Sequence, residues 1–245
     1  MKRLSRFYHS GVGKKAIVAV TGAIMLAFLV GHVVGNLKVF LPDPEPGVAD
    51  IDAYAEFLRA VGEPAFPRGA ILWIVRAVLL AAVLLHVIGV VQLARRNRVA
   101  RPVGYRETRY VRASLSARWM MLSGLLVLGF IVFHILHFTT GTVDPASFRP
   151  GGVYANLYAA FSRWPFVALY VVGMGFLALH LYHGAWSMFQ TLGLDNPDRN
   201  RAFRGLALVL ALGLFVGFTA VPVSFAVGAL DTPGTLNPPG VEVGQ

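Results

Sequence analysis

The chain has 245 residues, of which 56% are hydrophobic and only 14% are charged, and its formal net charge is +10. So large an apolar share excludes an ordinary soluble domain. Cysteine is absent, which excludes thiolate-bound iron–sulfur clusters and covalent thioether attachment of a cofactor within this chain.

Five apolar stretches are long enough to cross a bilayer core, which needs about 20 residues. They are residues 16–40, 70–94, 119–140, 165–190 and 203–230. Lipid offers no partner to unpaired backbone groups, so each stretch should be a helix. The expected fold is an all-α integral membrane protein. One transmembrane domain, 16–230, would lie between a short N-terminal segment, 1–15, and a Pro- and Gly-rich tail, 231–245.

Basic residues gather in alternate connections, which predicts the orientation of the chain. They are concentrated in the N-terminal segment, in the connection 95–118 and in the connection 191–202. The N-terminus should therefore be cytoplasmic and the C-terminus should lie outside. The excess positive charge is explained by topology and anionic lipid, so nucleic acid need not be a partner.

Shorter elements are expected on the outer side. Ile51, Tyr54, Leu58 and Val61 fall on one helical face, so the first outer connection should hold an interfacial helix with Asp50 as its N-cap. A second short helix is expected at 154–162. The aromatic residues near the membrane interfaces fit an aromatic belt: Trp119, Tyr158, Trp164 and Tyr170.

Four histidines lie in four successive apolar stretches: His32, His86, His134 and His180. Ionisable side chains in hydrocarbon are costly and usually mark a functional site. At about 1.5 Å per residue, His32 and His134 lie about 24 and 22 Å from the cytoplasmic ends of their helices. His86 and His180 lie about 12 and 15 Å from theirs. The four residues thus form an outer pair and an inner pair, each from two helices that run in the same direction.

Two histidines that face each other at one depth in a four-helix bundle can supply both axial ligands of a haem. The sequence therefore predicts two haems b and haem-iron ligation by His32, His86, His134 and His180. For one isolated histidine, an interhelical hydrogen bond or a proton relay would be the simpler explanation. The matched pairs favour haem.

A further histidine, His137, lies one turn beyond His134. Neighbours on one helix face cannot ligate opposite faces of one haem. The first and third stretches share a glycine ten residues before a histidine, Gly22 before His32 and Gly124 before His134. This spacing favours His134 as the ligand and suggests equivalent roles for the two helices. His137 is then expected beside a ligand or a propionate.

His183 lies one turn beyond His180 in the same way. Depth alone leaves the ligand open and slightly favours His183 as the mate of His86. Whichever of the two is not a ligand is a candidate neighbour of the inner haem or of its propionates.

Several motifs surround these residues: Gly13-Lys14-Lys15, Ala19-Val20-Thr21-Gly22, His32-Val33-Val34-Gly35-Asn36, Gly124 to His134 followed by Ile135-Leu136-His137-Phe138, and His180 to Gly184 followed by Ala185-Trp186-Ser187. Over residues 10–230 the chain resembles the di-haem cytochrome b membrane-anchor subunit of succinate dehydrogenase and fumarate reductase, in its single-polypeptide, five-helix form.

The resemblance implies that the outer haem is held by helices one and three and the inner haem by helices two and four. It selects His180 over His183, because the family ligand is followed four residues later by glycine, here Gly184. It also implies two soluble partners on the cytoplasmic face of a bacterial-type inner membrane. They are a flavoprotein that oxidises succinate with FAD and an iron–sulfur subunit. This chain would hold no succinate-oxidising residue and would pass electrons to a quinone, with menaquinone favoured and ubiquinone possible.

Two other functions fit the same residues. One is a di-haem cytochrome b that serves another respiratory dehydrogenase or a hydrogenase. The other is a haem-free transporter or anchor in which the histidines are polar contacts between helices.

Four other side chains are candidates for cofactor or quinone contacts. Arg76 and Lys38 could pair with a propionate of the outer haem, because buried carboxylates need cationic partners. Extension of Arg76 to the membrane interface is an equally good explanation. Glu63 and His9 are candidate quinone residues on the outer and inner sides. A solvated carboxylate is the simpler explanation for Glu63, and a surface position is an equal alternative for His9.

Overall fold

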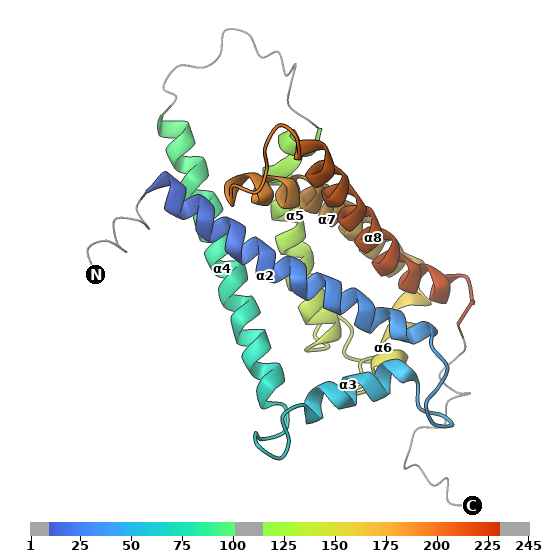
Figure 1. Cartoon of the computed structure of the whole chain (residues 1–245). Coiled ribbons are helices and arrows are strands. Elements are labelled where there is room, and N and C mark those ends of the chain that lie inside the picture. Colours follow the sequence, from blue (N-terminus) through green and yellow to red (C-terminus); the bar gives the residue numbers. More distant parts are fainter. Residues whose placement is uncertain (1–9, 101–114, 231–245) are drawn as a thin grey trace, which may run out of the picture.

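The computed structural model describes residues 10–100 and 115–230, and every regular element within these ranges is a helix (Figure 1). Five helices in this part of the chain are long and apolar enough to cross a membrane. They are α2 (Gly11–Leu37), which η1 (Lys38–Phe40) continues, α4 (Ala70–Val99), α5 (Leu115–Phe138), α7 (Trp164–Thr191) and α8 (Asn200–Ala226). The prediction of five membrane-crossing helices is confirmed.

All five long helices extend beyond their predicted bounds at one end or both, and α2 and α4 extend furthest, by five residues each. Helix α2 begins at Gly11 rather than at residue 16, because the side chain of Ser10 accepts a hydrogen bond from Gly13 N at 2.9 Å and caps the first turn. Helix α4 continues to Val99 rather than ending at residue 94. Its last turns carry exposed arginines, which a helix C-terminus accommodates well because they complement its partial negative charge.

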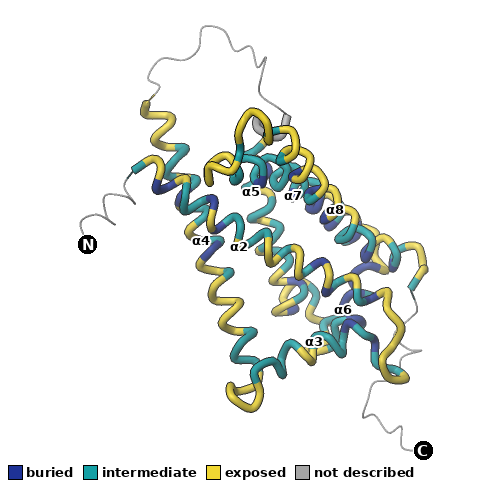
Figure 2. The backbone as a smooth tube through the Cα atoms, in the orientation of Figure 1, coloured by how far each residue is buried: buried dark blue, intermediate teal, exposed yellow. Residues whose placement is uncertain are grey.

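The long helices form one packed group with α4 at its edge. Helix α2 packs against α4, α7 and α8, while α7 packs against α5 and α8. Helix α4 packs on α2 and α3, and its packing on α5 and α7 is slight. Most of α4 is therefore exposed or half-buried (Figure 2). Large apolar side chains cover the outer surfaces of the long helices, as a lipid environment requires: Trp73, Leu80, Leu125, Val209 and Val216.

The two ends of the molecule differ in character. One end collects the C-terminus of α4 and the N-terminus of α8, with their arginines, and we call it the arginine-rich end (Figure 1). The opposite end is covered by the short helices α3 (Asp50–Ala60) and α6 (Val153–Phe161) and is called the α3–α6 end. Both short helices match the elements expected from the sequence.

The α3–α6 end contains the largest buried cluster of the described residues. Its members come from η1, α3, α6, α7 and α8 and the segment before α3: Val39, Ala49, Ile51, Tyr154, Leu157, Ala160, Phe161, Val167, Tyr170, Val221 and Phe225. Asp52 Oδ1 joins α3 to α6, because it accepts the backbone N–H groups of Val153 at 2.6 Å and Tyr154 at 3.1 Å. This carboxylate satisfies otherwise unpaired groups of the first turn of α6.

The predicted N-cap of α3 is wrong. Ala49 occupies the cap position without a side-chain hydrogen bond, and Asp50 is the first residue of the helix. The carboxylate of Asp50 instead binds Lys38 Nζ at 2.8 Å. This ion pair fixes the start of α3 against the end of α2.

Candidate functional site

Two pairs of histidines face each other between the long helices. His32 of α2 and His134 of α5 have ring centroids 6.0 Å apart and ring planes at 77°. His86 of α4 and His180 of α7 have ring centroids 6.5 Å apart and ring planes at 63°. The structure thus brings together the two pairs expected from depth and direction. Each pair joins two helices that pack little or not at all on each other directly.

The two histidine pairs lie at two levels along the helices, and a glycine lies beside each histidine of the His86–His180 pair. A Cβ built on Gly22 of α2 would lie 3.6 Å from Cε1 of His86. His32 follows ten residues later on the same helix, which corresponds to about 15 Å. Helix α5 repeats this arrangement, because a Cβ on Gly124 would lie 3.0 Å from Cε1 of His180. The repeated glycine-to-histidine spacing is therefore the distance between the two levels.

Nδ1 of His86 is held by helix α2. It lies 3.1 Å from the carbonyl oxygen of Val18 and 3.2 Å from the hydroxyl of Thr21. Because a carbonyl oxygen can only accept, this hydrogen-bond network assigns the proton to Nδ1 and leaves a lone pair on Nε2. An imidazole in this tautomer can ligate a metal through Nε2 while the backbone orients its ring.

Nδ1 of His180 has an equivalent neighbour on α5. The hydroxyl of Ser123 lies 3.4 Å from it and also donates to the carbonyl of Met120 at 3.1 Å. Sequence reasoning missed Thr21 and Ser123 as site residues. A signal was present, because each is a small hydroxyl residue that directly precedes one of the two repeated glycines.

Aromatic rings surround the other pair. His32 stacks on Phe28 with a centroid distance of 5.2 Å and lies 5.6 Å from the ring of Phe218. His134 lies 6.1 Å from the stacked ring of Phe130. These apolar walls would shield a planar ligand between the two histidines from water.

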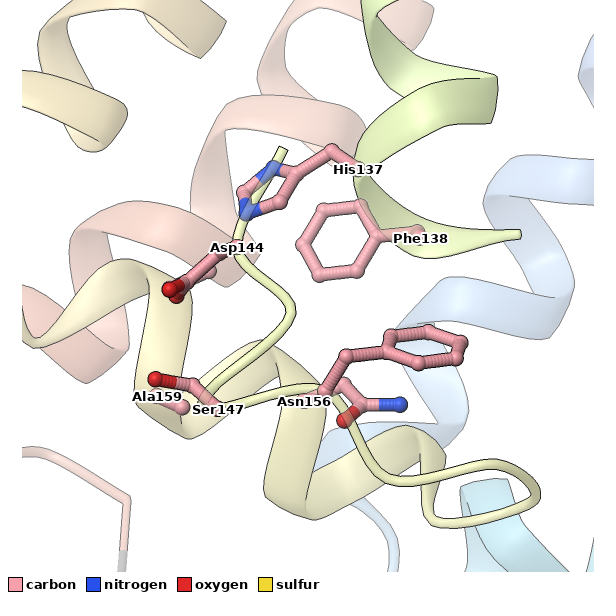
Figure 3. Close-up of a pocket in the computed structure, with 8 residues that line it drawn as sticks. His137, Phe138, Asp144, Ser147, Asn156 and Ala159 are labelled. Atoms are coloured by element: carbon pink, nitrogen blue, oxygen red, sulfur yellow. The ribbon is translucent and has the colours of Figure 1, made fainter. Parts of the chain in front are cut away.

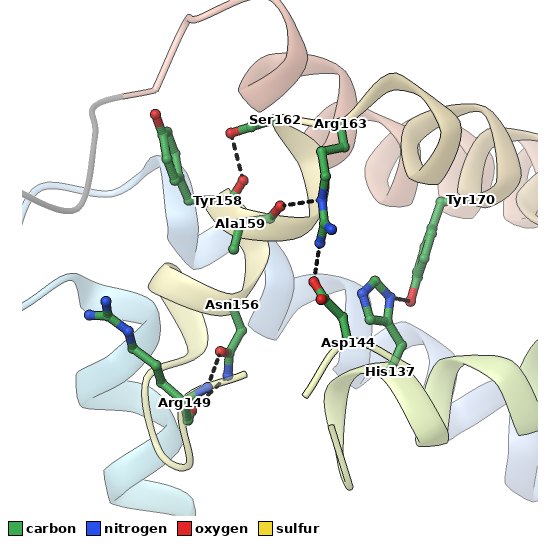
Figure 4. A network of polar contacts seen from close by, with 9 residues as sticks. All are labelled: His137, Asp144, Arg149, Asn156, Tyr158, Ala159, Ser162, Arg163 and Tyr170. Carbon is green, nitrogen blue, oxygen red and sulfur yellow. Dashed lines mark hydrogen bonds and ion pairs between the residues drawn. The ribbon is translucent and has the colours of Figure 1, made fainter. Parts of the chain in front are cut away.

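Tyr170 of α7 connects two histidines of α5. Its hydroxyl lies 3.1 Å from Nδ1 of His137 (Figure 4). It also lies 3.4 Å from Nδ1 of His134. Its predicted place in an aromatic belt is wrong, because Tyr170 is only 6% exposed. A buried phenol needs a hydrogen-bond partner, and the two histidines provide it.

His137 lines a small cavity at the α3–α6 end (Figure 3). Its volume of about 10 Å³ is close to that occupied by one water molecule. Asp144 lies on its wall and forms an ion pair with Arg163. Hydrogen bonding to this guanidinium lowers the pKa of Asp144 below its ordinary value. His137 thus lies between a buried tyrosine and a surface carboxylate.

His183 does not meet His86, although depth slightly favoured that pairing. Its ring lies 6.0 Å from that of Trp186, on the same helix, and Arg204 of α8 lies 4.7 Å above the Trp186 ring. Nδ1 of His183 and Nε1 of Trp186 are buried, and neither has a hydrogen-bond partner among the described residues. Buried polar atoms without a partner are rare in folded proteins, and these two atoms are available to an additional polar group.

The two basic propionate candidates differ in their surroundings. Arg76 is exposed, and its guanidinium lies 4.8 Å above the ring of Trp73. Lys38 is already bound to Asp50 at 2.8 Å. Arg76 is therefore the better placed of the two for an additional anionic partner.

The two quinone candidates are not brought into the site by the described structure. The side chain of Glu63 is 41% exposed and lies 4.0 Å from Arg68. His9 lies outside the described residues. In the described part of the chain, no group of three or more His, Asp or Glu side chains could hold a metal ion.

No family model, curated protein or solved structure matches the chain. The fold and the site define a multi-pass membrane protein with two levels of facing histidines.

Proposed function

We propose that this chain is the di-haem cytochrome b membrane-anchor and electron-transfer subunit of a succinate:quinone oxidoreductase. The observation that carries the cytochrome b assignment is the two facing histidine pairs in membrane-crossing helices, with centroids 6.0 and 6.5 Å apart. The assignment to this particular enzyme rests on the resemblance of the motifs around the same histidines.

The ring separations fit axial ligation of an iron from both sides. A histidine nitrogen lies about 2.0–2.1 Å from a first-row metal such as zinc, and the ring centre lies roughly 1 Å behind it. Two imidazoles that bind one metal from opposite sides would therefore have centres about 6.1 Å apart. Both observed pairs lie within a few tenths of an ångström of this value, so the residues fit the group.

The His32–His134 pair would hold one haem b and the His86–His180 pair the other. A bound haem supplies a one-electron carrier inside the membrane, and its axial histidines help to set its potential. The unpartnered Nδ1 of His183 and Nε1 of Trp186 lie one to two turns beyond His180. With Arg204 they would receive the propionates of the His86–His180 haem, while Arg76 is the candidate for those of the other.

The charge distribution supports a cytoplasmic arginine-rich end and an outer α3–α6 end. The His86–His180 pair then forms the inner level, nearer the soluble partners, and the His32–His134 pair forms the outer level. The arginines at the ends of α4 and α8 would bind the iron–sulfur subunit and its flavoprotein partner. The buried α3–α6 cluster would cover the outer level against water.

Two successive carriers would let electrons pass across the membrane to or from a quinone. Moving one charge through 100 mV is worth about 2.3 kcal/mol. A transmembrane path can therefore couple a low-potential quinone such as menaquinone to the membrane potential. Equal turnover in sealed vesicles with and without an uncoupler would contradict this coupling.

The test is purification of the intact complex with haem quantitation and identification of its subunits. We expect two haems b per chain and a larger partner with covalent flavin. Absence of haem b would overturn the cytochrome assignment in favour of a haem-free anchor or transporter. Haem without a flavoprotein partner would assign the chain to another respiratory enzyme.

Matched substitutions test the ligand pairs. His134→Ala should remove only the outer haem and His180→Ala only the inner one. The neighbours one turn away are the controls, because His137→Ala and His183→Ala should retain both haems. One haem per wild-type chain, or loss of both from either ligand variant with intact folding, would refute the two-level arrangement.

A further inference from the structure

Thr21-Gly22 of α2 and Ser123-Gly124 of α5 occupy equivalent positions in the structure. The Thr21 hydroxyl donates to carbonyl oxygens of its own preceding turn, at 2.7 Å from Ile17 O and 3.1 Å from Val18 O. The Ser123 hydroxyl donates at 3.1 Å to the carbonyl three residues before it, that of Met120. Each hydroxyl also lies within 3.4 Å of Nδ1 of a histidine from the next long helix along the chain.

The direction of these hydrogen bonds decides what the hydroxyls do for the histidines. Each hydroxyl proton is already engaged by a carbonyl of its own helix, so the oxygen of Thr21 or Ser123 can accept from Nδ1–H. His86 has a second acceptor in Val18 O at 3.1 Å. Both arrangements favour the tautomer that leaves Nε2 of the inner histidines with a lone pair.

The glycine of each pair lies beside the ring, and at Gly124 the missing side chain leaves space that the ring needs. A Cβ on Gly124 would lie 3.0 Å from Cε1 of His180, closer than most carbon contacts, and one on Gly22 would lie 3.6 Å from Cε1 of His86. The ring can therefore approach the helix backbone closely enough for Nδ1 to reach the hydroxyl.

The outer histidines are held differently. His32 is in contact with Phe28 and Phe218, and His134 is reached by the single phenol of Tyr170. The hydroxyl–glycine pair is thus a property of the inner level, present once on each of the two outward-running helices.

We propose that Thr21-Gly22 and Ser123-Gly124 are two copies of one positioning element that aims Nε2 of His86 and His180 at the inner haem and sets its reduction potential. The inference rests on the proposed function, because it requires haem at this level. A hydrogen bond from Nδ1–H makes the imidazole a more basic ligand and favours ferric iron. Loss of an acceptor hydroxyl should therefore raise the potential of the inner haem alone.

The experiment is a redox titration of the purified complex, with the two haems resolved by their absorption bands and by the EPR spectra of their ferric forms. The variants are Thr21→Val and Ser123→Ala, with Thr21→Ser as the conservative rescue. Thr219→Val is the matched control. Thr219 of α8 makes the same intrahelical hydrogen bond, to Phe215 O at 2.7 Å, and in the described part of the chain its hydroxyl has no hydrogen bond to a histidine.

We expect a positive shift of the inner-haem potential in Thr21→Val and Ser123→Ala, with the outer haem, Thr21→Ser and Thr219→Val unchanged. A tenfold loss of preference for ferric iron corresponds to 59 mV. Selective loss of the inner haem, restored in Thr21→Ser, would also support positioning. Two haems with wild-type potentials and EPR spectra in both variants would overturn the inference and leave the proposed function intact. Absence of haem from the wild-type complex would instead refute the proposed function itself.

Discussion

The hydroxyl of Tyr170 lies 3.1 Å from Nδ1 of His137, and both side chains are almost fully buried. The same hydroxyl lies 3.4 Å from Nδ1 of His134. One phenol of α7 therefore serves two histidines that are a turn apart on α5. This relationship gives the buried His137 a hydrogen-bond partner that belongs to the protein itself.

Replacement of Tyr170 by Phe should disturb the outer haem and leave the inner one unchanged. The substitution preserves the ring but removes the partner of His137, and a buried polar group without a partner costs about 1–3 kcal/mol. We expect a lower melting temperature of the purified complex and an altered spectrum of the outer haem. Tyr158→Phe is the control, since its ring packs near Phe225 and its hydroxyl has no hydrogen bond in the described structure. Identical spectra of the outer haem in Tyr170→Phe and Tyr158→Phe would contradict a role of the Tyr170 hydroxyl beside the outer haem.

Alanine substitutions at the two repeated glycines should have unequal effects. In Gly124→Ala the new Cβ would lie 3.0 Å from His180 Cε1, so the ring must move, whereas in Gly22→Ala the distance of 3.6 Å to His86 Cε1 is an ordinary contact. Both changes raise helix propensity by about 1 kcal/mol, so this effect cancels in the comparison. We expect Gly124→Ala to shift the EPR signal of the inner ferric haem and Gly22→Ala to match the wild type. A larger effect of Gly22→Ala than of Gly124→Ala would contradict the closer approach of His180 to its glycine.

Loss of the charge of Arg76 should lower the potential of the outer haem. A cation near the propionates favours the reduced iron, and among the described residues the ring of Trp73 is the one partner of Arg76. Arg76→Gln should therefore make the outer haem harder to reduce. Lys38→Gln should leave its potential unchanged and cost no more than about 1 kcal/mol of stability, because Lys38 is bound to Asp50. A shift of the outer-haem potential in Lys38→Gln but not in Arg76→Gln would assign the propionate contact to Lys38 instead of Arg76.

The ion pair of Asp144 with Arg163 should make stability depend on acid pH. Because the pKa of Asp144 is lowered in the folded protein, its contribution is present above the ordinary pKa of 3.8 and is lost as the pH falls through the lowered value. In Asp144→Asn this contribution is absent, so the variant should lose less stability than the wild type as the pH falls. Near neutral pH the substitution should cost no more than about 1 kcal/mol of stability, because the ion pair is partly exposed. Melting temperatures of the purified complex from about pH 6 down to pH 3 measure it. Asp43→Asn, at an exposed carboxylate, is the control and should follow the wild-type curve.

The long helices and the residues of the pairs could be predicted because both follow from simple geometry. A span of about 20 apolar residues has few alternatives in lipid. A constant rise per residue also places His32 level with His134 when their helices run in the same direction. The choice between His180 and His183 could not be made in this way. A depth measured from the end of an apolar stretch is displaced where the helix continues past it, as α4 does to Val99.

The side chains that hold the histidines could not be predicted for a different reason. The sequence around Tyr170 does not show whether its hydroxyl faces a lipid headgroup or a buried histidine. The packing of α5 against α7 decides between these two surroundings. Thr21 and Ser123 are ordinary small residues of transmembrane helices until α4 and α7 place an imidazole beside them. Such roles depend on how one helix is rotated about its axis relative to its neighbour. The sequence of a helix that is apolar on all sides specifies this rotation only weakly.

The edge position of α4 has a consequence for biogenesis. Because α4 packs on α2 and α3 and hardly touches α5 or α7, a newly inserted chain has little protein contact to draw this helix toward the second half of the molecule. A haem bridging His86 and His180 would supply the missing connection. Cofactor supply would then decide whether α4 is held to the second half of the molecule as well as to α2 and α3.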